Sequence, residues 1–206
     1  LVLRYPVYLA VTPYRFIELL SSLSGLFVTT YKRDDEVVLE GVTGAKGLVR
    51  FEYSDECLSL RGYLGWTLWG ADVCANGRYS FSVDPNWTNE VNRMLHELLS
   101  VRLPFFLESL PSRFMVSEVD LVDVIDTAVV KDVVKGFVNI TRLGLVVVSN
   151  PLELFVGLFH RRKLEEGFAV RGGKVARTDR VYIPEGKKVI VGAFGLAPST
   201  LAAVKY

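Results

Sequence analysis

The sequence has few of the residues from which metal centres and covalent scaffolds are built. Among its 206 residues there are two cysteines and two histidines, and Cys57 and Cys74 do not form a CxxC pair. These counts exclude a cysteine-rich zinc site and a disulfide-rich scaffold of the secreted type. We therefore expect a cytoplasmic chain in which both cysteines are buried thiols. A single bridge between them stays open, because intracellular disulfides occur in hyperthermophiles.

The sequence also lacks an excess of charge of either sign. It has 24 Lys and Arg residues against 23 Asp and Glu residues, which gives a net charge of +1. A strongly basic domain attracts nucleic acid or an anionic membrane through its overall field, and this chain has no such field. Binding to a polyanion would therefore have to come from a local basic patch.

Long apolar runs are missing as well. The longest nearly uncharged stretch, from Leu143 to Phe159, contains Pro151 and Glu153 and is shorter than the roughly 20 residues that cross a bilayer. Pro6 interrupts the apolar N-terminal segment, and no small-residue cleavage site follows it. We expect a soluble protein with no transmembrane segment and no signal peptide.

Common catalytic motifs are absent too. The sequence contains no HExxH, GxGxxG, GxxxxGKS or GxxxxGKT motif and no local signature of a Ser/His/Asp triad. This disfavours the usual zinc enzymes, hydrolases and nucleotide-binding enzymes, so we predict no catalytic residue, no metal site and no cofactor. His96 and His160 are expected to be exposed on helices. Asp120, Asp123 and Asp126 recur every three residues, which we interpret as the solvated acidic face of a helix.

Half of the residues are apolar, which is typical of a well-packed globular protein. Two segments of the chain share one sequence pattern. In each, an apolar run is followed by Thr12-Pro13 or by Asn150-Pro151 and then by an amphipathic stretch. The polar residue suits an N-cap and the proline suits the first helical position, so we predict a helix after each. Gly25 would end the first helix. Several β-like runs follow both, which suggests an internal repeat, although helix initiation alone could produce the likeness.

A β-rich region lies between Leu26 and Val83, where short apolar runs are separated by turn residues. Asn76-Gly77 is the strongest turn signal, because both residues tolerate the positive φ of a hairpin turn. A further break is expected at Gly70. The spacing predicts an antiparallel meander of five or six strands.

Further helices are predicted beyond this region. One begins at Asp84-Pro85 and continues, with a kink, through Pro104. Apolar residues three or four apart predict another over Ser117 to Gly136. We then expect a strand over "FVNITRLGLVVVS", the helix after Pro151, and β-like runs around residues 168–170, 180–183 and 188–194.

The order of elements in residues 1–114 is the strand "VYLAV", the helical segment "TPYRFIELLSSLSGL", the antiparallel strands from Leu26 to Val83 and the long helix "DPNWTNEVNRMLHELLSVRLPFFLESL". This order resembles the helix-grip fold of the START and Bet v 1-like (SRPBCC) superfamily. The resemblance covers a little over half of the chain and concerns the order of elements. It implies that a hydrophobic ligand binds between the curved sheet and the long helix.

The residues that would line such a cavity are mostly aromatic. Core packing is the alternative for them, and exposed aromatic residues would also suit a partner interface. The predicted ligand-binding residues are Phe51, Tyr63, Trp66, Trp69, Tyr79, Phe81, Trp87 and Met94.

Taken together, the elements predict an α+β protein with antiparallel β-sheets packed against helices. The segment from Leu110 to Ser117 is the least arbitrary boundary. We predict a helix-grip-like α+β subdomain over residues 1–115. Residues 116–206 would form a smaller strand–helix–strands subdomain packed on the first, with a partial internal repeat as one explanation.

Two groups of charged residues are candidate sites. The basic cluster Arg161, Arg162 and Lys163 is placed by the helix prediction at a helix C-terminus, where the helix dipole alone favours cations. The alternative is contact with an anion such as nucleic-acid phosphate. On the predicted strands, a surface charge ladder is favoured over an anion clamp for Arg50, Arg61 and Arg78 with Glu40 and Glu52.

These observations lead to three functional hypotheses. The first is a non-catalytic binding protein for a hydrophobic or amphipathic small molecule. The second is an interaction subunit of a larger, nucleic-acid-processing complex, with protein partners and direct contact through the basic cluster. The third is an enzyme with an unfamiliar carboxylate site, and it has least support because no spacing fixes a pair of titratable groups. The sequence does not determine the ligand, the partner or the oligomeric state.

Overall fold

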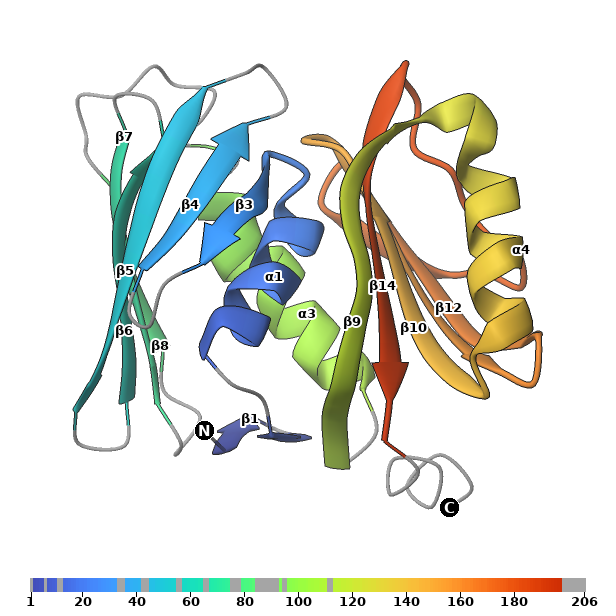
Figure 1. The fold of residues 1–206 in the computed structure, drawn as a ribbon, viewed down its shortest axis with the longest axis horizontal. Coiled ribbons are helices and arrows are strands. Elements are labelled where there is room, and N and C mark those ends of the chain that lie inside the picture. The colour runs from blue at the N-terminus through green and yellow to red at the C-terminus, as the bar shows by residue number, and fades with distance from the viewer. Residues whose placement is uncertain are drawn as a thin grey trace.

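The protein, described here as a computed structural model, has two β-sheets with helices between them and a further helix on one outer face (Figure 1). The structure describes residues 2–5, 7–10, 13–32, 36–41, 45–54, 57–64, 67–74, 79–83, 93, 96–110 and 113–197. Largely antiparallel sheets that pack against separate helices confirm the predicted α+β class.

The six-stranded sheet is an antiparallel meander. Its strands follow chain order: β3 (Phe27–Lys32), β4 (Glu36–Gly41), β5 (Lys46–Ser54), β6 (Cys57–Leu64), β7 (Thr67–Cys74) and β8 (Tyr79–Val83). The predicted meander is confirmed, but the break expected at Gly70 is wrong because this residue lies within β7. The Asn76-Gly77 turn lies outside the described residues.

The eight-stranded sheet joins the start of the chain to its second half. Its spatial order is β1 (Val2–Tyr5), β2 (Val7–Ala10), β9 (Arg113–Asp126), β14 (Lys188–Leu196), β10 (Leu143–Ser149), β11 (Glu153–His160), β12 (Lys163–Arg171) and β13 (Lys174–Arg177). Only β2 and β9 pair in parallel, and the other neighbours of this sheet are antiparallel.

Helix α1 (Pro13–Ser24) begins and ends where the sequence predicts, and it lies between the two sheets (Figure 1). Every residue from Phe16 to Ser24 is buried, because α1 contacts strands of both sheets. Its serine hydroxyls donate to backbone carbonyls within the helix, as in the bond from Ser21 to Ile17, so the buried polar groups are satisfied. Gly25 then turns the chain with a φ of 68°.

The helix that contains Pro104 continues through it, as predicted. A π-helical turn, η1 (Leu98–Arg102), is followed directly by α3 (Leu103–Ser109). The N–H of Leu103 donates to the carbonyl of Leu98, which is the wide spacing of a π-turn. The irregularity expected from proline therefore takes the form of a widened turn just before it.

The helix predicted over Ser117 to Gly136 is wrong in its first half. Residues up to Asp126 form β9, the short 3-10 helix η2 (Thr127–Val129) follows, and α4 (Val130–Ile140) begins only there. Strand β9 is apolar on both faces because it lies between two cores. Val116 and Val122 pack against the core between the sheets, and Leu121 and Ile125 pack against the core under α4. Two apolar faces on a strand imitate the three-to-four spacing of a helix.

The expected aspartate face of this helix is wrong for the same reason. Successive side chains of a strand point to opposite faces, so residues three apart do not share one. Asp123 and Asp126 are exposed.

The helix predicted after Asn150-Pro151 is also wrong, because this segment is strand β11. The Asn150 Oδ1 atom accepts hydrogen bonds from the N–H groups of Leu152 and Glu153, at 2.9 and 2.7 Å. These are the bonds expected of an N-cap, but here they close a turn between β10 and β11. The two proline-containing segments thus adopt different structures, and the internal repeat stays a prediction.

Other C-terminal predictions are partly confirmed. Strand β10 begins at Leu143, because residues 137–140 of the predicted strand belong to α4. The runs at 168–170 and 188–194 lie in β12 and β14, residues 180–183 are not a strand, and β13 was not predicted.

The predicted boundary at residue 115 falls inside β9, and β1 and β2 pair with the second half of the chain. One core of buried side chains joins α1, α3 and the inner faces of both sheets. The division into two subdomains therefore does not follow the sheets, and it stays a prediction.

Candidate functional site

The predicted ligand-binding residues are only partly described. Phe51 is 7% exposed and belongs to the core between the sheets, whereas Tyr63 is 43% exposed. Phe51 pairs with the buried Leu60 and Tyr63 lies three residues further along β6, so these two side chains lie on opposite faces. Trp69, Tyr79 and Phe81 lie in described strands, but their side chains are outside the described set, as are residues Trp66, Trp87 and Met94 entirely.

The space between the sheets holds the protein's own side chains wherever the structure describes it. Residues of α1, such as Phe16 and Leu20, pack with Phe106 of α3 and with the inner faces of both sheets. Two cavities of about 550 and 500 Å³ border the second half of the chain, and neither is lined by the six-stranded sheet. The hydrophobic-ligand hypothesis stays a prediction.

The outer face of the six-stranded sheet carries a ladder of ion pairs. Arg50 Nε lies 2.6 Å from Glu36 Oε1, and Arg61 Nη2 lies 2.9 Å from Asp72 Oδ1. The predicted surface ladder is confirmed for these two arginines, although their partners are Glu36 and Asp72 and not Glu40 and Glu52. Arg78 lies outside the described residues.

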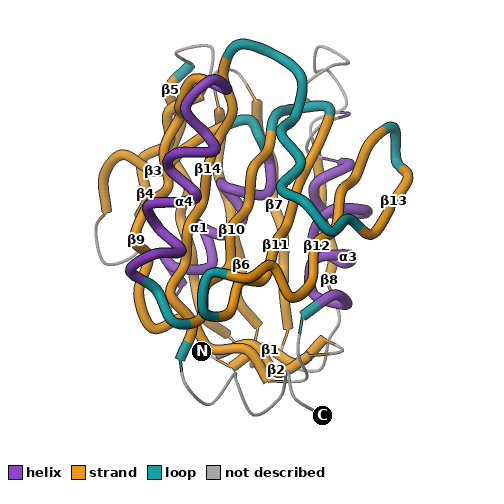
Figure 2. Tube along the Cα trace, turned by 90° about the vertical axis from the view of Figure 1, so that its right-hand side faces the viewer, coloured by secondary structure: helices purple, strands orange, loops and turns teal. Residues whose placement is uncertain are grey.

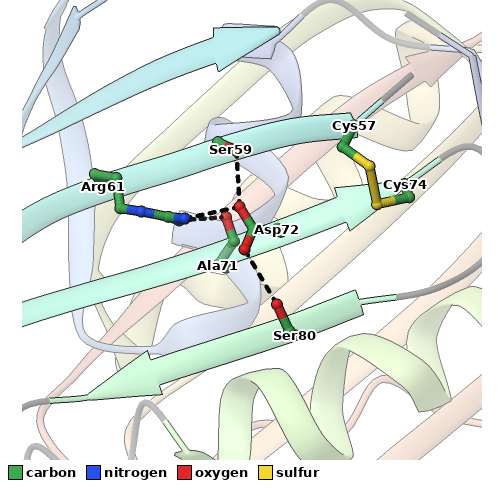
Figure 3. The surroundings of a disulfide bond; sticks show 7 residues. All are labelled: Cys57, Ser59, Arg61, Ala71, Asp72, Cys74 and Ser80. Carbon is green, nitrogen blue, oxygen red and sulfur yellow. Dashed lines mark hydrogen bonds and ion pairs between the residues drawn. A yellow bond between two sulfur atoms is a disulfide. The ribbon is translucent and has the colours of Figure 1, made fainter. Parts of the chain in front are cut away.

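Asp72 is the most connected member of this ladder (Figure 3). The Ser59 hydroxyl donates to it at 2.7 Å and the Ser80 hydroxyl at 3.1 Å. The hydrogen bond from Ser59, supported by Arg61 and Ser80, lowers the pKa of the Asp72 carboxyl. All of its oxygens are occupied, so the group stabilises three neighbouring strands and offers no free acid or base.

Beside this ladder, Cys57 and Cys74 form a disulfide (Figure 3). The prediction of two buried thiols is wrong. The two residues are direct partners in the β6–β7 ladder, with their Cα atoms 4.0 Å apart, although they are separated by 17 positions in the sequence. Only the register of the two strands reveals this proximity.

The basic cluster lies at the tip of a hairpin and not at the end of a helix. Strands β11 and β12 are joined by Arg161 and Arg162, with His160 and Lys163 as the closing pair. Both arginines have positive φ, 48° and 70°. A two-residue turn of this kind strongly favours Asn-Gly, because residues with a larger side chain rarely adopt positive φ.

Arg142 lies against this tip. The N–H of Arg161 donates to the carbonyl of Arg142 at 2.9 Å, which joins the hairpin to the segment between α4 and β10. Arg142, Arg161, Arg162 and Lys163 are all exposed, and we call these four residues the arginine hairpin. Within the described part of the chain, the guanidinium groups of its three arginines form no ion pair, whereas Lys163 lies 3.8 Å from Glu165.

His160 closes the hairpin and is half-buried at the end of β11, so the prediction of an exposed helical histidine is wrong. Its Nε2 atom is buried and has no hydrogen-bond partner among the described residues.

A buried arginine, which the sequence did not single out, joins three segments at the opposite end of the sheet. Arg102 is 1% exposed, and its guanidinium donates to the carbonyls of Leu23, Ser24, Asn150 and Pro151 at 2.9–3.2 Å. Two of these carbonyls belong to the last turn of α1, where no helical partner is available. Burial lowers the pKa of Arg102, and Glu97, 3.6 Å from Nε, opposes that shift.

A buried carboxylate, that of Glu153, lies at the start of β11, two residues after the Pro151 carbonyl that Arg102 binds. Its Oε1 atom lies 2.8 Å from Arg171 Nε and accepts a hydrogen bond from the Tyr182 hydroxyl, and its Oε2 atom accepts one from the N–H of Glu185. Burial and the bond to Glu153 raise the pKa of Tyr182. These contacts hold the chain after β13 against the sheet.

Comparison with known protein families, curated proteins and solved structures found no match. The described ranges contain no helix with the length and hydropathy needed to cross a membrane. Among the same residues, no group of three or more His, Cys, Asp or Glu side chains could hold a metal ion. The arginine hairpin is therefore the candidate functional site.

Proposed function

We propose that this protein is a non-catalytic interaction module that contacts the phosphates of nucleic acid through the arginine hairpin. The observation that carries the proposal is the pair of arginines at both positive-φ positions of the β11–β12 turn. Each costs about 1 kcal/mol or more relative to a residue that tolerates this conformation. Asn-Gly would form the same turn with less backbone strain.

The chemistry of the exposed groups fits phosphate. A guanidinium presents a planar fork of N–H donors that matches the geometry of a phosphate, and it stays charged at any physiological pH. The narrow tip projects Arg161 and Arg162 beyond the last strand pair, and Arg142 extends the basic surface toward α4. Because the net charge of the chain is only +1, the interaction is local.

The first test removes the charge from the tip. We expect the triple variant Arg142→Ala, Arg161→Ala, Arg162→Ala to bind a labelled duplex DNA about 100-fold more weakly than the wild type at about 50 mM salt. Each lost phosphate contact should also reduce the slope of log K against log salt by about 1. Fluorescence anisotropy over a salt series measures both quantities.

The matched control removes three exposed cations elsewhere, with Lys174→Ala, Arg180→Ala and Lys187→Ala. It has the same net charge as the triple variant and should keep most of the affinity. Equal losses in both variants, absence of binding by the wild type at low salt, or binding to anionic vesicles in preference to nucleic acid would each contradict the proposal.

A second test separates binding from stability. The double variant Arg161→Asn, Arg162→Gly should raise the free energy of unfolding by about 1 kcal/mol while it weakens nucleic-acid binding. It relieves two left-handed conformations, and the greater freedom of glycine in the unfolded chain offsets part of that gain. Arg161→Ala, Arg162→Ala loses the same charges but retains the backbone strain, so it should bind weakly without this gain. Urea unfolding and fluorescence anisotropy distinguish the Asn-Gly variant from the Ala-Ala variant. A lower stability of the Asn-Gly variant would show that the positive φ of Arg161 and Arg162 does not destabilise the turn.

The helix-grip arrangement of residues 1–114 is also a proposal. The order β2, α1, the six-stranded meander and then η1–α3 supports it. The helix-grip resemblance implies that a hydrophobic ligand binds between the sheet and the long helix. The described residues of the six-stranded sheet line neither of the two cavities, so we do not propose hydrophobic-ligand binding as a second function.

A further inference from the structure

A second site lies at the end of the eight-stranded sheet opposite the arginine hairpin. A cleft of about 500 Å³ is bordered by the helical residues Arg93 and Glu97, by the β10–β11 turn and by the β12–β13 turn. The β12–β13 turn lies at the edge of the sheet in Figure 2. Its charged lining residues are Arg93, Glu97, Glu153, Arg171 and Glu185. Glu153 pairs with Arg171 at one end of β11 and His160 with Lys163 at the other, about 24 Å away by strand length.

One wall of this cleft is organised by ion pairs and hydrogen bonds around Arg171 and Glu153. Arg171 lies between two carboxylates, with Nε 2.8 Å from Glu153 and Nη2 3.1 Å from Glu185. Glu153 is itself 5% exposed, and the Tyr182 hydroxyl and the N–H of Glu185 bind its oxygens as well. These two ion pairs restrict the orientations of the Arg171 guanidinium before any ligand arrives, which reduces the entropic cost of binding.

The cleft retains unused donors and acceptors of both signs. The Nη1 group of Arg171 makes no described contact, and Arg93 is exposed and without an ion-pair partner among the described residues. One oxygen of Glu97 lies 3.6 Å from Arg102, and its second oxygen has no partner within the same residues. Glu185 is likewise engaged through one oxygen only.

The rim leaves room for a ligand. Gly172 and Gly173 form the β12–β13 turn with φ of 56° and 71°, and a Cβ added at either would meet nothing within 4 Å. Leu152, 61% exposed, supplies an apolar edge. A backbone turn without side chains beside an open cleft allows a small molecule to approach closely.

From this arrangement we infer that the cleft binds a small zwitterion of the α-amino acid type. Its carboxylate would be bound by the guanidinium groups of Arg93 and Arg171, and its ammonium group by the free oxygens of Glu97 and Glu185. Charges of both signs balance in the cleft once Arg102 is counted with Glu97, so a ligand with one net charge gains less than one that carries both signs.

The test uses three probes that share the alanine side chain: L-alanine carries both charges, N-acetyl-L-alanine keeps only the carboxylate and is larger by an acetyl group, and L-alanine amide keeps only the ammonium group. Isothermal titration and ligand-observed NMR should show saturable binding of L-alanine. Each singly charged analogue should bind about tenfold more weakly, because each loses one charge-assisted hydrogen-bonded group. Equal binding of L-alanine and either analogue overturns the inference, as does absence of L-alanine binding at millimolar concentration.

A pair of surface variants locates the site. Arg93→Gln should weaken L-alanine binding about tenfold, because it removes one guanidinium without disturbing the Glu153 network. Lys174→Gln removes an exposed cation just beyond the Gly172-Gly173 turn and should leave binding unchanged. Equal effects of the two variants overturn the inference. Since neither variant changes the arginine hairpin, this result is independent of the proposed nucleic-acid binding.

Discussion

Replacement of Arg102 by methionine is expected to lower the free energy of unfolding by about 3–5 kcal/mol. Methionine fills a similar volume but has no N–H group, so the carbonyls of Leu23, Ser24, Asn150 and Pro151 all lose their donor. The loss falls where α1, the β10–β11 turn and η1 meet, and three of the four hydrogen bonds are buried. Urea unfolding followed by circular dichroism measures the change.

Two further variants refine this experiment. Arg102→Lys keeps the charge but cannot reach four carbonyls with one ammonium group, so its loss should be intermediate. Arg180→Met removes a guanidinium that is 88% exposed and should change stability by less than about 0.5 kcal/mol. A loss below about 1 kcal/mol in Arg102→Met would show that water replaces the guanidinium and that this junction is not a centre of stability.

Reduction of the Cys57–Cys74 disulfide is expected to cost about 3 kcal/mol of stability. The bridge joins residues 17 positions apart, and opening it returns conformational freedom to the unfolded chain. After reduction, β6 and β7 are held together by their backbone hydrogen bonds and by the contacts of Asp72 with Ser59 and Arg61. Unfolding in denaturant with and without a phosphine reductant gives the difference.

The double variant Cys57→Ser, Cys74→Ser is the control for this reduction. It should be as unstable as the reduced wild type and should not respond to the reductant. A wild type whose stability is unaffected by reduction, with free thiols verified by mass spectrometry, would contradict the expected contribution.

Some elements could be predicted because their signals are local. Thr12-Pro13, the apolar spacing that follows and Gly25 are contained in one short segment, and α1 has the expected bounds. The meander was predicted in the same way, from apolar runs separated by turn residues. The surface ladder followed from strand positions alone, although its partners depended on a register that the sequence does not state.

Other elements could not be predicted because their environment lies elsewhere in the chain. Strand β11 is buried almost throughout, and a fully buried strand has no alternating pattern to distinguish it from a helix. The helix prediction after Pro151 in turn placed Arg161 and Arg162 at a helix end. Their positive φ, which carries the proposed function, becomes visible only when β11 and β12 pair.

The sequence by itself determined the α+β class, the first helix, the six-stranded meander and the basic cluster as a candidate site. Each rests on neighbouring residues, whose capping, alternation and charge act over a few positions. Only the tertiary structure decided that β9 and β11 are strands, that Cys57 and Cys74 pair, and that Arg102 joins its own segment to two others. These features depend on contacts between residues far apart in the chain, where burial on both sides overrides local periodicity.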